Sequence, residues 1–197
     1  MRVKICGITN YEDAINAVNA GASALGFVFY EKSPRYIKPQ NALLIVEKLP
    51  PFVQIVGLFV NETTENINKI SLESKMQVAQ IIDDKNIVDY SKLNIKAIKV
   101  VRVKEKEDLE KLENIYYLVD AFVDSFGGAG KRIDLDFFKN IDCSKFILAG
   151  GLSKDNLKEL NGFGFFAIDV SSAVEKEKGK KDKEKMEEFL KEAYEIL

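Results

Sequence analysis

Two residues of this sequence could exchange a proton with a substrate, and each stands where an apolar run stops. Cys6 ends the run that begins at Val3, and Asp124 ends the run over residues 118–123. The chain has no histidine, the side chain most often used in acid–base catalysis. Proton transfer would therefore fall to cysteine, carboxylate, lysine or tyrosine side chains, and these two residues are the first candidates.

Cys6 has two interpretations. As a thiolate it could act as a base or nucleophile, with a pKa set by burial and nearby positive charge. As a thiol it could fill space as a small apolar side chain, and the residue type alone favours this role. The only other cysteine is Cys143, and two cysteines make neither a disulfide framework nor a zinc cluster.

Asp124 also has two interpretations, and its residue type and position favour both equally. A carboxylate after an apolar strand is often half-buried with a raised pKa, which suits a general acid. It could instead cap a helix or close a turn. Asp120 lies four residues earlier and hence on the same strand face, but deeper, so it ranks below Asp124 as a proton donor.

Other polar residues also follow apolar runs. Gly150-Gly151 and Ser171-Ser172 come after the last two runs, where backbone N–H groups and hydroxyls could together hold a phosphate. Arg35 follows Pro34 in a loop and could bind a carboxylate with two hydrogen bonds, although a surface arginine is the commoner outcome. Gln80 and Asp169 complete the set of polar candidates.

Such residues can act together only if the fold gathers the strand ends. Short apolar runs alternate with amphipathic stretches, and we predict strands over residues 3–8, 24–30, 54–60, 77–82, 96–103, 117–124, 145–149 and 165–170. We predict helices over residues 11–20, 41–49, 64–74, 86–93, 107–113, 135–140, 154–160 and 182–196.

Strands that alternate with helices imply parallel β-α-β connections in an α/β fold. A doubly wound open sheet and a (β/α)8 TIM barrel both fit, and eight regular units favour the barrel as a single domain over residues 1–197. The active site would then lie at the carboxyl ends of the strands. The charged run 175–188 is expected to be mostly a solvated loop that enters an exposed helix.

Composition limits the classes of partner that this chain could bind. With 29 basic and 31 acidic residues the net charge is −2, which argues against a nucleic-acid partner. No apolar run reaches the roughly 18 residues that span a bilayer, and the N-terminus carries no signal-like segment. We expect a cytoplasmic protein with no membrane partner; a homodimer and a monomer both stay open.

Several segments occur in an order that is found in one enzyme family. They are Lys4-Ile5-Cys6-Gly7-Ile8-Thr9, Gly26-Phe27-Val28-Phe29-Tyr30, Lys32-Ser33-Pro34-Arg35-Tyr36, Val56-Gly57-Leu58-Phe59-Val60-Asn61, Val123-Asp124-Ser125, Gly127-Gly128-Ala129-Gly130-Lys131, Ala149-Gly150-Gly151-Leu152, Asp169-Val170-Ser171-Ser172-Ala173-Val174-Glu175 and Gly179-Lys180-Lys181-Asp182. Across nearly the whole chain, the ordered set resembles the phosphoribosylanthranilate isomerase family.

The resemblance implies an Amadori rearrangement, an aldose–ketose isomerisation in tryptophan biosynthesis that takes a small phosphorylated substrate and needs no cofactor or metal. N-(5-phosphoribosyl)anthranilate would become 1-(2-carboxyphenylamino)-1-deoxyribulose 5-phosphate, with Asp124 as general acid and Cys6 as general base. Arg35, Gln80 and Asp169 would bind the substrate. The resemblance assigns phosphate binding to Gly128, Gly150, Gly151, Ser171 and Ser172.

One segment departs from the family pattern. Gln80-Ile81-Ile82-Asp83 stands where the family usually has Gln-Leu-His-Gly. Two alternatives to an active member of this family stay open. One is a related phosphate-binding barrel, such as a histidine-pathway isomerase, although that chemistry is usually assigned to two aspartates. The other is a metabolite-binding module without turnover, for which the altered segment is the only support.

Overall fold

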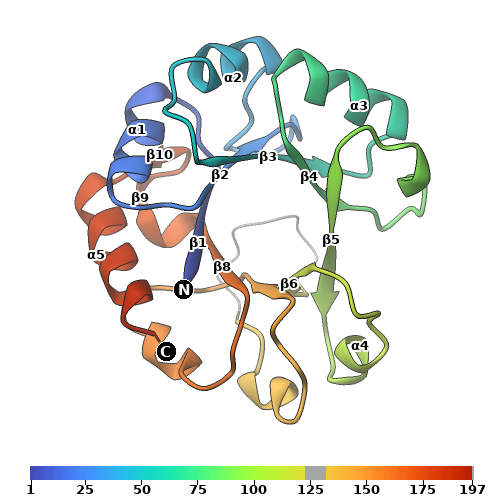
Figure 1. The fold of residues 1–197 in the computed structure, drawn as a ribbon, viewed down its shortest axis with the longest axis vertical. Helices are drawn as coiled ribbons and strands as arrows, with labels where there is room; N and C mark the ends of the chain where they lie inside the picture. The colour runs from blue at the N-terminus through green and yellow to red at the C-terminus, as the bar shows by residue number, and fades with distance from the viewer. Residues whose placement is uncertain (123–131, 197) are drawn as a thin grey trace.

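Eight parallel strands close into a barrel, in the order β1-β2-β3-β4-β5-β6-β7-β8, in the computed structural model of the chain (Figure 1). The structure describes residues 1–122 and 132–196. The strands are β1 (Arg2–Cys6), β2 (Ala24–Val28), β3 (Gln54–Val60), β4 (Val78–Ile82), β5 (Lys96–Val103), β6 (Tyr117–Ala121), β7 (Phe146–Leu148) and β8 (Ala167–Val170). The predicted (β/α)8 barrel is confirmed.

Helices surround the barrel (Figure 1). They are α1 (Tyr11–Asn19), α2 (Pro39–Val46), α3 (Thr64–Glu73), α4 (Glu107–Glu110) and α5 (Lys183–Tyr194). Side chains cap the first turns of two of them: Asn10 accepts from the Asp13 amide at α1, and Thr63 accepts from the Asn66 amide at α3. Across residues 1–122 and 132–196, no helix is long and apolar enough to cross a bilayer.

Three predicted helices are wrong. Residues 86–93, 135–140 and 154–160 contain only the short 3-10 turns η1 (Tyr90–Lys92), η2 (Leu135–Phe138) and η3 (Leu157–Leu160). In the first two, an aspartate just before the turn accepts a hydrogen bond from the amide two residues on, Asp89 from Ser91 and Asp134 from Asp136. This local bond competes with the longer-range bonds of an α-helix and favours a tight turn.

The inside of the barrel is polar at one end and apolar at the other. Along β1, Val3 and Ile5 pack into the main core, so by the two-residue period of a strand Lys4 and Cys6 face the barrel interior. Lys4 is the register partner of Asp169 on β8. A separate apolar cluster is formed by Leu118, Ile147, Ala149 and Ala167. Polar side chains that face inward beyond it can meet one another and a ligand.

A small hairpin follows the barrel, and the sequence did not predict it. After the 3-10 turn η4 (Ser172–Val174), strands β9 (Glu175–Glu177) and β10 (Lys180–Lys181) pair in antiparallel fashion. Most residues of the run 175–188 are exposed, as expected. Glu175 and Lys181 are exceptions, because both are buried.

Candidate active site

The carboxyl ends of the barrel strands bring several candidates to one region. Cys6 ends β1, Gln80 lies on β4, and Asp169 lies on β8, where the backbone leads into Ser171. All three of these side chains are buried. Asp124 and Gly128 lie outside the residues that the structure describes, so their assigned roles stay predictions.

Cys6 lies between groups that act on its ionisation in opposite directions. Burial raises the pKa of the Cys6 thiol, and the Asp169 carboxylate adds to that effect. The Lys4 and Lys181 ammonium groups lower the pKa, but the net result is a raised value. In the free protein Cys6 is therefore mainly a thiol at neutral pH, and it becomes a stronger base once it ionises.

Lys4 is held beside Cys6 by an ion pair inside the barrel. Its Nζ lies 2.8 Å from Oδ1 of Asp169, and both side chains are buried. Burial alone would lower the pKa of Lys4, but the charges of Asp169 and Cys6 raise it above its ordinary value. Lys4 was not predicted as a site residue, although it lies two residues before Cys6 on the same predicted strand. Side chains two residues apart on a strand share one face.

Arg35 is buried, so the alternative of a surface arginine is wrong. Its Nε donates to Oε1 of Glu175 and its Nη2 donates to Oε2, each at 2.8 Å. This is a paired, charge-assisted contact that fixes the plane of the guanidinium group. The sequence identified Arg35 but missed Glu175, which lies 140 residues away along the chain.

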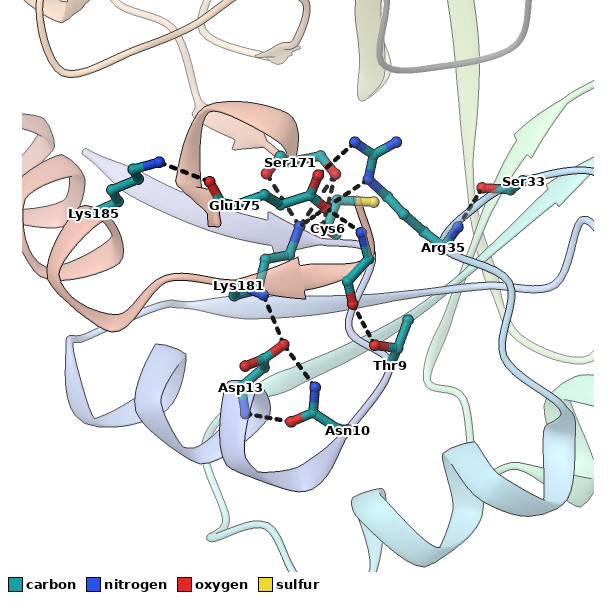
Figure 2. A network of polar contacts seen from close by, with 11 residues as sticks. Cys6, Thr9, Asn10, Asp13, Ser33, Arg35, Ser171, Glu175, Lys181 and Lys185 are labelled. Atoms are coloured by element: carbon teal, nitrogen blue, oxygen red, sulfur yellow. Dashed lines mark hydrogen bonds and ion pairs between the residues drawn. The ribbon is translucent and has the colours of Figure 1, made fainter. Parts of the chain in front are cut away.

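Lys181 completes this cluster. Its Nζ lies 2.9 Å from Oε1 of Glu175 and donates to the Ser171 carbonyl at 3.1 Å. The Ser171 hydroxyl in turn donates to the Cys6 carbonyl at 3.0 Å. Figure 2 shows Arg35, Lys181 and Ser171 gathered around the Glu175 carboxylate, with Cys6 beside them. The network ties the hairpin and the loop after β8 to the end of β1.

The two glycine and serine segments lie after β7 and β8, as predicted. Gly150 and Gly151 have φ values of 88° and 62°, in the left-handed region that favours glycine. In the described part of the chain, no backbone hydrogen bond is donated by the amides of Gly150, Gly151 or Ser172. Free amides on adjacent loops are the donors that a phosphate group needs.

Gln80 and the altered segment after it have separate roles. The Oε1 atom of Gln80 is buried and has no hydrogen-bond partner among residues 1–122 and 132–196, so it is an acceptor ready for a donor on a ligand. Asp83 accepts from the amides of Ile87 and Val88 at 3.0 and 3.1 Å. The aspartate that replaces the family's usual glycine therefore stabilises the loop after β4.

Asp120 is a further ionisable group inside the barrel. Burial raises the pKa of its carboxyl group to about 6, and the Asp169 carboxylate contributes in the same direction. The amide of Ala121, which donates to Asp120 Oδ1 at 2.8 Å, and the charge of Arg102 oppose the shift. Asp120 thus takes up a proton in mildly acidic solution.

Taken together, the described residues can hold an anion with an arginine and free amides, and can exchange a proton through a thiol. A family model described as N-(5'phosphoribosyl)anthranilate (PRA) isomerase matches residues 3–192. An N-(5'-phosphoribosyl)anthranilate isomerase from Nitratiruptor sp. is 56% identical over 193 residues, which are 98% of both chains.

Solved structures agree with the family match. The crystal structure of phosphoribosyl anthranilate isomerase from Thermotoga maritima superposes with a TM-score of 0.91 at 38% identity and full coverage of both chains. A phosphoribosyl anthranilate isomerase in complex with reduced 1-(o-carboxyphenylamino)-1-deoxyribulose 5-phosphate has a TM-score of 0.84 at 37% identity, again with full coverage of both chains.

Proposed function

The chain belongs to the N-(5'-phosphoribosyl)anthranilate isomerase family and is an isomerase of tryptophan biosynthesis, and we propose that Cys6 is its general base and Asp124 its general acid. The reaction is the rearrangement of N-(5-phosphoribosyl)anthranilate to 1-(2-carboxyphenylamino)-1-deoxyribulose 5-phosphate. It requires opening of the furanose ring and removal of a proton from C2 of the sugar.

The observation that carries the proposal is the position of Cys6. Its thiol is buried at the carboxyl end of β1, where barrel enzymes place catalytic groups, and two ammonium groups act on its ionisation. A structural cysteine would have no need of buried cations around it. Cys143, the other cysteine, is also buried, but the charge that acts on it is that of the neighbouring Asp142, and it adds to the effect of burial in raising the pKa.

In the proposed mechanism the acid and the base act in sequence. Asp124 gives a proton to the ring oxygen as the C1–O bond breaks, which leaves a protonated Schiff base between C1 and the anthranilate nitrogen. The Cys6 thiolate then takes the C2 proton, and the electron pair of that C–H bond forms the C1–C2 double bond of an enolamine. Tautomerisation of the enolamine gives the ketone.

The remaining groups bind the two charged ends of the substrate. Arg35 pairs with the anthranilate carboxylate, and the amides of the loops at Gly150 and Ser171 hold the phosphate. A phosphorylated ligand is supported by a related enzyme that has been solved in complex with reduced 1-(o-carboxyphenylamino)-1-deoxyribulose 5-phosphate. Gln80 and Asp169 bind the polar groups between the two ends. Two anchored ends leave the reacting carbons held between the catalysts.

The deciding experiment generates N-(5-phosphoribosyl)anthranilate in situ and follows loss of its fluorescence. Wild-type protein should consume it, and Cys6→Ser should be slower by about 10²- to 10⁴-fold, the usual contribution of a general base. Cys143→Ser is the matched control and should keep wild-type turnover per folded molecule. A Cys6→Ser protein with near wild-type rates would remove Cys6 as the base.

A further inference from the structure

The guanidinium group of Arg35 is held by only one of its edges. Nε and Nη2 face the two oxygens of Glu175 in a side-on pair. Because guanidinium is planar with five N–H groups, this contact leaves both hydrogens of Nη1 and the outer hydrogen of Nη2 on the opposite edge. Among residues 1–122 and 132–196, Nη1 has no hydrogen-bond acceptor. The free N–H groups of Nη1 and Nη2 can therefore donate to the two oxygens of a second carboxylate in an end-on pair.

Glu175 is itself fixed from the other side. The Nζ of Lys181 donates to its Oε1 at 2.9 Å, and the Gly179 amide donates to the same oxygen at 3.3 Å. Burial alone would raise the pKa of Glu175, but the hydrogen bond from Arg35 and the charge of Lys181 lower it overall. The carboxylate therefore stays ionised and cannot turn away from Arg35.

The aliphatic part of Arg35 is positioned as well. Gly7 has a φ of 80°, and a methyl group at Gly7 would collide with Cδ of Arg35. The arginine stem thus lies across the backbone that follows Cys6. With its stem fixed at Gly7 and one edge fixed at Glu175, the guanidinium group has a single orientation before any ligand arrives.

The charge balance of the cluster suits an anionic ligand. A carboxylate next to Arg35 would by itself weaken the attraction of the guanidinium group for a second carboxylate. Lys181, whose side chain is fully buried, restores one net positive charge to the set of three residues. Lys181 also reaches the Ser171 carbonyl and hydroxyl, so the same lysine connects this cluster to the loop after β8.

We propose that Glu175 is a positioning residue that orients Arg35 to recognise the carboxylate of the substrate, and so makes the site selective for N-phosphoribosylated anilines that carry an ortho carboxylate. The proposal rests on the function proposed above. Its physical basis is preorganisation: a long side chain that is already ordered loses less conformational entropy when it binds. Glu175 itself contacts no part of the substrate.

The test compares two ligands, reduced 1-(2-carboxyphenylamino)-1-deoxyribulose 5-phosphate and the same compound without its ring carboxylate. The ratio of their dissociation constants measures how well a protein recognises the carboxylate. Glu175→Gln should reduce this ratio by about ten- to a hundredfold, the usual range for a charge-assisted hydrogen bond. Binding of the compound without the carboxylate should change little.

Two further variants make the result specific. Glu177→Gln is the matched control, since Glu177 lies in the same hairpin and pairs with exposed Lys180, and it should leave the ratio unchanged. Glu175→Gln removes the negative charge that pairs with the buried cations Arg35 and Lys181, and this destabilises the fold. Glu175→Asp keeps the negative charge and should fold more readily. Its shorter side chain cannot meet both Arg35 and Lys181, so it should show an intermediate loss of the ratio.

A double-mutant cycle separates positioning from a general structural effect. In the Arg35→Ala background, Glu175→Gln should have no further effect on the ratio, because Arg35 is the group through which Glu175 acts. Equal weakening of both ligands by Glu175→Gln, or an unchanged ratio, would overturn the proposal. Absence of turnover in wild type would instead count against the proposed function, since ligand binding is measured without turnover.

Discussion

Cys6 on β1 and Gly26 on β2 are register partners, and the sulfur of Cys6 lies directly over the backbone of Gly26. A methyl group added to Gly26 would lie 2.9 Å from Sγ of Cys6 and 3.0 Å from Nζ of Lys4. Both distances are shorter than ordinary van der Waals contact. The absence of a side chain at Gly26 therefore creates the space in which the thiol and the ammonium group lie next to each other.

Gly26→Ala should impair catalysis more than stability. The thiol and the flexible end of Lys4 can move aside at modest cost, but a displacement of about 1 Å at a catalytic group can lower turnover about a hundredfold. Steady-state kinetics beside thermal unfolding would measure both effects. Gly57→Ala is the contrasting variant, because its methyl group would press on Phe29, Phe59 and Met76, and it should lose stability but keep turnover per folded molecule.

The thiolate absorbance of Cys6 should rise with pH from neutral into the alkaline range. Burial and the Asp169 carboxylate raise the pKa of Cys6, so the thiolate is the minor form at neutral pH and its fraction increases about tenfold per pH unit below that pKa. The difference in absorbance between wild type and Cys6→Ser, followed against pH, would test this. A difference that stays flat from roughly pH 6 to 9 would contradict a Cys6 thiol with a raised pKa.

Lys4→Met should move the titration of the Cys6 thiol to higher pH. The ammonium group of Lys4 lowers the pKa of Cys6, so its removal leaves burial and Asp169 to raise the pKa further. The same difference in thiolate absorbance would measure the shift. Removing one partner of a buried pair costs about 3–5 kcal/mol, so the spectra must be taken where the variant is folded. Lys4→Arg keeps the charge and should keep the titration near its original position.

Asp120→Asn should stabilise the protein at neutral pH. The folded-state pKa of Asp120 is about 6, above the value of about 3.9 in an unfolded chain, so this group destabilises the folded state increasingly from about pH 4 and to the full extent above about pH 6. The asparagine removes that penalty, and the free energy of unfolding should rise by about 1–3 kcal/mol at pH 7.5. Urea unfolding at several pH values would show the gain shrinking on acidification and vanishing below about pH 4.

Asp124→Asn should abolish most turnover, because an amide cannot give the ring oxygen a usable proton, whereas Asp120→Asn should stay active. Both variants make the same chemical change on the same segment, so each is the control for the other. Single-turnover rates in the fluorescence assay would compare them, with an expected loss of about 10²- to 10⁴-fold for Asp124→Asn alone. The reverse pattern would make Asp120 the general acid.

The sequence was sufficient for the barrel and for one part of the site. Eight apolar runs with turn residues between them predicted eight strands, and the bounds of β3 and β5 match the prediction. Strand alternation is a local property, so it also predicts that the side chains of Cys6 and Asp169 share the barrel interior. The short 3-10 turns were missed because hydrophobic periodicity cannot tell a brief helix from a tight turn that local side chains stabilise.

The partners of the site residues were decided by tertiary structure alone. Arg35 and Glu175 lie 140 residues apart, and neither has a sequence neighbour that indicates the other. The run 175–188 has the composition of a solvated segment, which holds for most of its residues. Glu175 and Lys181 are buried because the hairpin packs against the ends of β1 and β8. There Glu175 forms ion pairs with both Arg35 and Lys181. Composition determines how costly a buried charge is, whereas only the folded chain provides the partner that makes burial tolerable.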